Sequence, residues 1–289
     1  MNESYSLNSP VRDTFSLRIR RFTNDQGFNK PGSYSYFTVI LLSKATGRLT
    51  ADASQYTVED LSLLTFSLYQ PFEIDCPSAF EGYAFEFHPD FFCLHRHRSE
   101  VSCNGVLFNN IYESPLTKLS ESEAAELSAV ASCALSEIKR NDADSEALLS
   151  YLKVLLISAT RIRLAQANKK SDKVKKTPAK LQELQSAIED NFRSIHNAAG
   201  YADILNYSAS VLNRACRDYF NKTLSELITD RIVLEAKREL YLTEKPVKAI
   251  AYDLGFNDEF HFSRYFKRNI GVSPQYFRDT VGAGKATVD

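Results

Sequence analysis

The chain has 289 residues, of which 44% are hydrophobic and 25% are charged, and its formal net charge is −1. This composition is that of an ordinary soluble protein, and no run approaches the roughly 18 apolar residues of a membrane span, which argues against an integral membrane protein. The length predicts two domains, because a single hydrophobic core rarely grows past roughly 250 residues.

The first part of the chain has the pattern of β structure. Residues 1–22 contain no apolar segment of the signal-peptide type, so we expect a cytoplasmic protein. Short runs of β-branched and aromatic residues follow, separated by Gly and Pro, at 34–43, 47–52, 60–68 and 82–88. Eight or so such strands would form a jelly-roll or cupin-like barrel over residues 1–118. The aromatic residues expected in the core are Phe37, Phe66, Phe72, Phe85 and Phe87.

A metal site is the main alternative use of this region. His88, His95 and His97 are its only histidines, and neutral imidazoles can bind a metal. Arg96 and Arg98 flank two of them and would repel a cation, so we predict a basic loop and no metal. The five cysteines form no C-x-x-C pair, and we expect reduced thiols. They are Cys76, Cys93, Cys103, Cys133 and Cys216.

Two helices are predicted between residues 119 and 167. Ser120 and Glu123 form the pattern of a capping box, which opens a helix that runs to about Arg140. The second helix spans about 145–166 and carries an apolar seam with alternating spacings of four and three. The seam consists of Leu148, Leu152, Leu155, Ala159 and Ile162. Such a seam either packs against the barrel of its own chain or pairs two subunits as a coiled coil does.

The charge balance changes at a lysine-rich stretch. Residues 1–167 contain 15 basic and 20 acidic residues, a net of −5, whereas residues 168–289 contain 20 and 16, a net of +4. The basic C-terminal part favours a polyanionic partner. Residues 168–180 include six lysines, and we expect a solvated linker here, with contact to phosphates as the alternative.

The C-terminal part, 181–281, is helical throughout. A first helix is predicted by the apolar stripe Leu181, Leu184, Ile188 and Phe192. A helix-turn-helix follows, with Ala202 and Leu205 on its first helix and Ser208 as the N-cap of its second. The predicted buried residues of that second helix are Leu212, Cys216 or Ala215, and Tyr219.

The helix-turn-helix pattern is repeated about 50 residues later in the chain. Ala251 and Leu254 correspond to Ala202 and Leu205, and Asp258 replaces Ser208 as the cap. Asn221 and Gly271 end the two second helices, and both residue types accept the left-handed conformation found there. The small core of the second copy is predicted to consist of Phe256, Phe262, Phe266 and Tyr276, and Pro274 starts a closing helix.

A single long helix is expected between the two copies. Its stripe consists of Leu224, Ile228, Ile232, Ala236 and Leu240, and Thr243 and Pro246 mark its end. Such a helix would fix the distance between the two units.

The outward faces of the two second helices remain to be explained. Arg and short polar side chains on an exposed helix suit base edges in a major groove, although a solvated charged face is the alternative. The candidates for base edges are Ser210, Asn213, Arg214, Glu259, Ser263 and Arg264. The candidates for phosphate contacts are Arg217, Lys222, Lys267 and Arg268.

The second copy carries a specific motif. Ile250-Ala251 precedes Gly255-Phe256 and Asp258, then Phe262-Ser263-Arg264-Tyr265-Phe266-Lys267, Gly271, Pro274 and Phe277-Arg278. With it, residues 181–281 resemble the DNA-binding domain of the AraC/XylS family of transcription regulators. The first copy departs from the pattern, with Cys216 for the usual Phe and Asn221 for the usual Gly.

The resemblance implies the remaining expectations. It implies an α+β multidomain protein with a cupin-like sensor domain through which a small-molecule effector or a partner exerts control. It also implies a homodimer formed through the 119–167 helices, and RNA polymerase as a further partner. We predict a DNA-binding transcription regulator with no catalytic residues, cofactor or metal. Two alternatives remain open: a cupin-type metalloenzyme with a regulatory helical tail, and a module whose helices bind another protein.

Overall fold

The computed structural model describes residues 2–9, 14–23, 28–52, 54–77, 80–94, 97, 105–173 and 178–281. The chain divides into two compact units. The N-terminal unit comprises Met1–Asn110 and Ser114–Ala167, and the C-terminal unit comprises Ile111–Glu113 and Asn168–Asp289. None of the helices in these ranges combines the length and apolar character that a membrane crossing requires.

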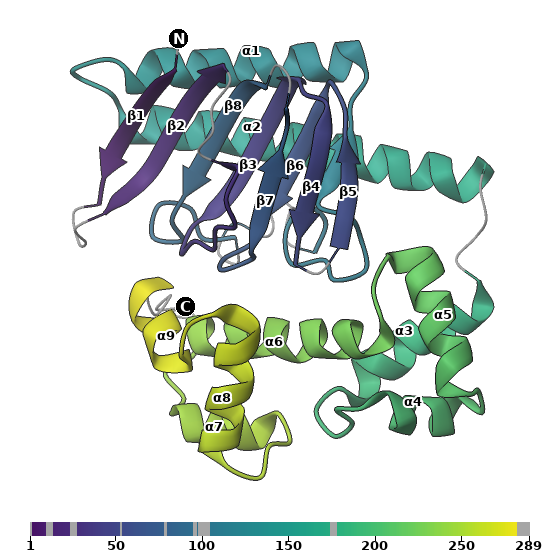
Figure 1. Ribbon diagram of the computed structural model, residues 1–289. Helices are drawn as coiled ribbons and strands as arrows, with labels where there is room; N and C mark the ends of the chain where they lie inside the picture. Colours follow the sequence, from purple (N-terminus) through teal and green to yellow (C-terminus); the bar gives the residue numbers. More distant parts are fainter. Residues whose placement is uncertain are drawn as a thin grey trace. The chain divides into compact units, whose positions relative to one another are not determined.

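The N-terminal unit is built from antiparallel strands in two sheets (Figure 1). The larger sheet has the order β1-β2-β8-β3-β6-β9, and the smaller has the order β5-β4-β7. In chain order the strands are β1 (Glu3–Asn8), β2 (Phe15–Thr23), β3 (Phe37–Lys44), β4 (Gly47–Ala51), β5 (Ser54–Val58), β6 (Ser62–Phe66), β7 (Phe72–Asp75), β8 (Glu81–Phe87) and β9 (Leu116–Lys118). The described strands confirm the β-rich N-terminal domain, and they form two sheets that do not close into a barrel.

The core lies between the two sheets and continues on the outer side of the larger one. Ile40 and Leu42 of β3 pack in one cluster with Leu49 of β4 and Ile74 of β7. Val39 and Leu41 point the other way and are buried as well, since neighbouring residues of a strand face opposite sides. The five aromatic residues predicted for the core, Phe37, Phe66, Phe72, Phe85 and Phe87, are all buried.

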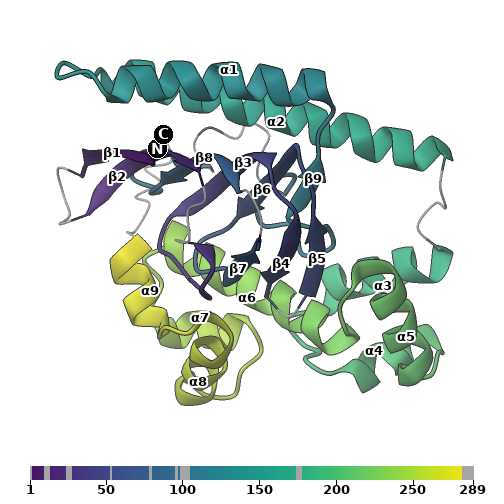
Figure 2. The same cartoon turned by 45° about the horizontal axis from the view of Figure 1, so that its top comes forward.

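Two helices run along one side of the larger sheet (Figure 2). They are α1 (Glu121–Ile138), which opens with the predicted Ser120–Glu123 capping box, and α2 (Ser145–Lys173). A hydrogen bond from Ser158 to Glu126 joins them at 2.6 Å. All five residues of the predicted apolar seam are buried inside this single chain, so the seam packs intramolecularly and is not a free dimer surface. α2 also extends past its predicted end at residue 166.

The C-terminal unit is helical, as predicted. Its helices are α3 (Ala179–Asn191), α4 (Ala198–Leu205), α5 (Ala209–Phe220), α6 (Leu224–Leu242), α7 (Val247–Asp253), α8 (Glu259–Ile270) and α9 (Pro274–Val281). The long helix α6 runs from the group α3–α5 to the group α7–α9 (Figure 1). Leu224, Ile228, Ile232, Ala236 and Leu240 are buried along it, so the expected spacer helix is present.

Candidate nucleic-acid interface

Helices α5 and α8 are equivalent in length and in their ends. Each has 12 residues. The side chains of Ser208 and Asp258 accept hydrogen bonds from the third backbone N–H that follows, which satisfies a donor that the helix leaves open. Asn221 and Gly271 end the helices in the left-handed conformation, with φ of 57° and 86°. The predicted repeat is therefore present in three dimensions.

The buried faces of α5 and α9 each differ from the prediction at one position. Tyr219 is 44% exposed and Tyr276 is 54% exposed, whereas their neighbours Phe220 and Phe277 are buried. In the second copy the Phe277 ring lies 5.7 Å from that of Phe266. The assignments of Tyr219 and Tyr276 to the core were wrong by one residue each, because spacings of three and four both fit one helix face.

The outward face of α5 presents Ser210, Arg214 and Arg217 to solvent. The Arg214 side chain is 86% exposed, and its Nε lies 3.8 Å from a carboxylate oxygen of Asp218, so the guanidinium is held only loosely. Asn213 is placed differently from the expectation. Its Oδ1 accepts a hydrogen bond from the backbone N–H of Leu224 at 3.0 Å, which satisfies the first turn of α6. That oxygen therefore serves the fold of the unit.

The outward face of α8 presents Arg264, Lys267 and Arg268 to solvent, whereas Glu259 and Ser263 are half-buried. The structure adds one residue that the sequence reasoning missed. Phe260 is 77% exposed, which is more than any other large hydrophobic side chain among the described residues. It lies four residues before Arg264, and therefore one turn earlier on the same face. The repeat could have identified it, because Phe260 corresponds to the candidate Ser210.

Lys222 does not lie where a phosphate contact requires. Its side chain is only 10% exposed, and its Nζ lies 2.6 Å from a carboxylate oxygen of Asp230. The same Nζ donates to the backbone carbonyl of Ile111 at 3.3 Å. Because the charge is buried and paired within the unit, we remove Lys222 from the set of phosphate candidates.

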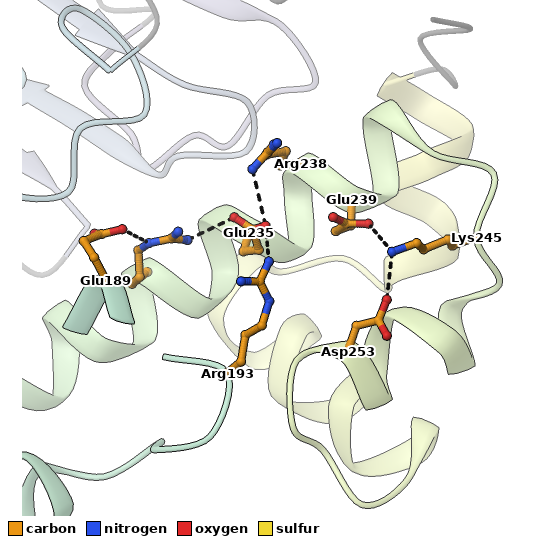
Figure 3. Close-up of polar contacts among 8 residues, drawn as sticks. Glu189, Arg193, Glu235, Arg238, Glu239, Lys245 and Asp253 are labelled. Carbon is orange, nitrogen blue, oxygen red and sulfur yellow. Dashed lines mark hydrogen bonds and ion pairs between the residues drawn. The ribbon is translucent and has the colours of Figure 1, made fainter. Parts of the chain in front are cut away.

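The spacer helix is fixed by ion pairs at both ends of the unit (Figure 3). Glu235, whose side chain is 3% exposed, receives hydrogen bonds from Arg193 at 2.8 Å, Arg231 at 3.2 Å and Arg238 at 3.4 Å. Arg231 also reaches Glu189 of α3 at 2.7 Å. These contacts attach α6 to α3 and to the residues that follow it.

A second set of ion pairs serves the other half of the unit. Lys245 lies 3.1 Å from Glu239 of α6 and 2.8 Å from Asp253 of α7 (Figure 3). The pairs raise the pKa of Lys245, first through the hydrogen bond to Asp253. Arg278 of α9 donates to the backbone carbonyl of Leu240 at 3.2 Å. α6 is thus connected to α7 and α9, so one continuous scaffold holds α5 and α8.

The two described histidines of the N-terminal unit, His88 and His97, make different contacts. His88 is buried, and its Nδ1 accepts from the backbone N–H of Asp90 at 3.2 Å. His97 stacks on Phe92, with ring centroids 4.7 Å apart. His95 lies outside the described residues, as do Arg96 and Arg98. Within the described ranges, no three His, Cys, Asp or Glu side chains are grouped so as to hold a metal ion.

Two capped helices with exposed basic faces, held by one spacer, define the C-terminal unit as a double helix-turn-helix DNA-binding domain. A family model described as "Helix-turn-helix domain" matches residues 201–280. The regulatory protein SoxS of Escherichia coli strain K12 is 34% identical over 98 residues, which are 34% of this chain and 92% of SoxS. The chain belongs to the AraC/XylS family of transcription regulators.

Two further comparisons concern proteins that are longer than SoxS. The raffinose operon transcriptional regulatory protein RafR of Pediococcus pentosaceus is 31% identical over 97 residues, which are 34% of this chain and 35% of RafR. The matched part therefore spans about a third of that relative. A crystal structure of an apo ToxT variant from Vibrio cholerae strain SCE256 is 15% identical, with a TM-score of 0.42, and the alignment covers 98% of this chain and 97% of that one.

Proposed function

We propose that this transcription regulator reads DNA with α5 and α8 in two successive major grooves, under the control of its N-terminal unit. The observation that carries the proposal is the equivalence of Arg214 and Arg264. Both are exposed, and each lies six residues after its helix cap. The N-terminal half of a recognition helix faces the bases, and Arg binds guanine with two hydrogen bonds.

The other exposed residues take roles that follow from their positions. Ser210, Phe260, Ser263 and Glu259 lie near the start of the two helices and are proposed to face base edges. Phe260 suits the methyl group of thymine, since apolar side chains contact that group. Arg217, Lys267 and Arg268 lie one turn farther on, where a recognition helix approaches the phosphates. Asn213 is proposed to contribute through its amide nitrogen only.

The test compares two substitutions on α8. Arg264→Ala is expected to weaken binding to the best site by about 1–3 kcal/mol and to relax the preference at one base pair. Lys267→Ala is expected to weaken specific and random DNA alike and to lower the salt slope by about one unit. Fluorescence anisotropy with specific and with random DNA, at several salt concentrations, measures the affinities and the salt slopes. If Arg264→Ala reduced both affinities equally, Arg264 would be a phosphate contact.

The proposed control by a small ligand is supported by a polar cluster inside the N-terminal unit. Glu86 is 1% exposed and is paired with Arg18 at 2.5 Å and Arg20 at 3.2 Å. Arg18 also donates to the Tyr36 hydroxyl at 3.1 Å. Arg18 and Arg20 bring two guanidiniums beside an apolar core, and guanidiniums bind carboxylates and other small anions. Carboxylate metabolites that raise the melting temperature of the protein, but not of Arg20→Gln, would support this site, and no such compound in a broad panel would contradict it.

Further roles follow from the family. We propose a cytoplasmic homodimer that contacts RNA polymerase, and no enzymatic activity. A metalloenzyme would retain stoichiometric metal through purification, and loss of that metal on substitution of His88 would favour it. A module that binds another protein would show no salt-sensitive affinity for DNA.

A further inference from the structure

The C-terminal unit includes three residues from a distant part of the chain, Ile111–Glu113. The Tyr112 hydroxyl donates to the Glu189 carboxylate at 3.0 Å, and the Tyr112 ring lies 5.8 Å from that of Phe220. The carbonyl of Ile111 accepts from Lys222. This segment thus contacts α3, the last residue of α5 and the connection between α5 and α6.

The contacts concentrate where the first recognition helix ends. Phe220 closes α5, Asn221 is its left-handed C-cap, and Thr223 already caps α6. Between them, Lys222 is held by both Ile111 and Asp230 of α6. Phe220 is 8% exposed, and loss of the Tyr112 ring would uncover part of it. The end of α5 is therefore stabilised by a segment that lies outside the helix-turn-helix sequence.

The hydrogen bond of Tyr112 is of the strong type. Its acceptor is a carboxylate, and hydrogen bonds to charged groups are stronger than those between neutral groups. Burial, with Glu189 as the second cause, raises the pKa of Tyr112 far above its usual value, so the hydroxyl remains a donor at any physiological pH. Glu189 is in turn held by Arg231, which connects the segment to the ion pairs of α6.

The residues on either side of the segment belong to the N-terminal unit and are fixed there. The backbone N–H of Asn109 donates to the Ser67 hydroxyl at 2.9 Å. Arg163 of α2 donates to the backbone carbonyl of Ser114, and the Pro115 carbonyl accepts from the N–H of Thr65 at 3.0 Å. A rearrangement of α2 or β6 would therefore act on the chain immediately next to Ile111–Glu113.

We propose that the surface formed by Glu189, Phe220 and Lys222 is a docking site for the chain's own segment Ile111–Glu113, and that this segment transmits the state of the N-terminal unit to the first recognition helix. The regulatory part rests on the proposed DNA reading by α5. Docking holds the α5–α6 connection in its DNA-binding conformation, and release of the segment loosens it.

The test is hydrogen–deuterium exchange on the full chain without DNA. Tyr112→Ala is expected to raise exchange about tenfold in residues 217–227, the scale of losing one hydrogen bond to a charged group, and to leave residues 262–270 unchanged. Tyr112→Phe removes only the hydroxyl and should give a smaller rise. Tyr252→Ala is the matched control, since Tyr252 is exposed on α7. Unchanged exchange in 217–227 for Tyr112→Ala would overturn the docking.

The proposed transmission from the N-terminal unit to α5 is tested by a substitution in the N-terminal unit. Arg163→Ala is expected to raise exchange in residues 217–227 as well, whereas Arg161→Ala, an exposed neighbour on α2, is not. A rise with Tyr112→Ala but not with Arg163→Ala would leave the segment as a purely structural part and would overturn the regulatory role. Since exchange is measured without DNA, failure to bind any DNA would contradict the proposed function while leaving the docking supported.

Discussion

At the residue scale, His196 is a titratable group whose state depends on packing within the C-terminal unit. It follows α3, and its ring lies 4.8 Å from that of Phe256 in the turn before α8. Its Nε2 is buried and has no hydrogen-bond partner among the described residues. Burial is the largest cause and lowers the pKa of His196, and interactions with the backbone of Leu254 and Phe192 oppose this only in part. The folded unit therefore favours the neutral imidazole.

This predicts a loss of stability in mild acid. A histidine whose pKa is lowered by folding binds fewer protons in the folded than in the unfolded state, so its contribution is fully present above the unfolded pKa of about 6.5 and is lost as the pH falls below it. The decrease in the free energy of unfolding between pH 7.5 and 5.5 should be smaller in His196→Gln than in the wild type. Urea denaturation at both pH values measures it. Equal decreases would show that His196 does not contribute, and His261→Gln controls for its neighbour.

At the element scale, the attachment of α6 to its neighbours depends on one carboxylate. Glu235 is the shared acceptor for Arg193, Arg231 and Arg238, and of these only the Arg231 side chain is well buried, at 13% exposure. Removal of the negative charge leaves the Arg231 guanidinium to its remaining carboxylate partner, Glu189. The exposed partners lose less, because water replaces the carboxylate for them.

Glu235→Gln is therefore expected to reduce the free energy of unfolding of the C-terminal unit by about 2 kcal/mol, the scale of a hydrogen bond to a charged group. Arg238→Ala is the matched comparison and should cost at most about 0.5 kcal/mol, since its side chain is 57% exposed. Urea denaturation followed by far-ultraviolet circular dichroism measures both. A cost for Arg238→Ala equal to that of Glu235→Gln would contradict this account.

The sequence predicted the elements of the C-terminal unit well because caps, turns and a repeat all agree there. Ser208, Asp258, Asn221 and Gly271 are local signals that act within one turn of helix. The errors arose where two positions fit one face equally, as with Tyr219 and Phe220. The repeat would have resolved that case, since Phe220 corresponds to the buried Ile270 and Tyr219 to the half-buried Asn269.

Other features depend on contacts that sequence patterns do not encode. Lys222 was indistinguishable from a surface lysine because its partners Asp230 and Ile111 are brought together only by folding. Strands β1 and β2 begin before the region identified as β structure. Arg18 and Arg20 of β2 resemble surface residues in sequence, yet they share the buried Glu86.

At the scale of the whole molecule, the predicted seam of α2 is not available for a contact between two subunits. Leu152 and Leu155 are each 1% exposed within one chain, so their replacement by Asp would unfold the N-terminal unit. The outward face of α2 carries Val154 and Leu164, which are 47% and 45% exposed. If the protein dimerises through its helices, as the family implies, this face is the available apolar surface.

We therefore predict that Val154→Asp combined with Leu164→Asp converts the dimer to a monomer without reducing thermal stability. The charges oppose burial at an interface but are tolerated at a solvated surface. Sedimentation equilibrium at tens of micromolar measures the state of the full chain, and Ser150→Asp, exposed on the same helix, is the control. A wild-type monomer at that concentration would contradict the prediction.

The distance between the recognition helices leads to a prediction about the operator. α6 has 19 residues, which corresponds to a length of about 28 Å, close to the roughly 34 Å between successive major grooves on one face of DNA. Only three residues separate α5 from α6, and Lys245 ties the other end of α6 to α7. The two recognition helices are thus expected to move as one body within the C-terminal unit.

Operators with 5 or 10 extra base pairs between the segments read by α5 and α8 should consequently bind no better than a single segment. The insertion of 5 places the second segment on the opposite face of the DNA, and the insertion of 10 restores the face but adds about 34 Å, which a continuous helix cannot bridge. Binding is measured by anisotropy on an operator obtained by selection from genomic DNA, with base substitutions outside both segments as the control. If affinity returned with 10 extra base pairs but not with 5, a flexible connection would join the two helices, and α6 would not set their spacing.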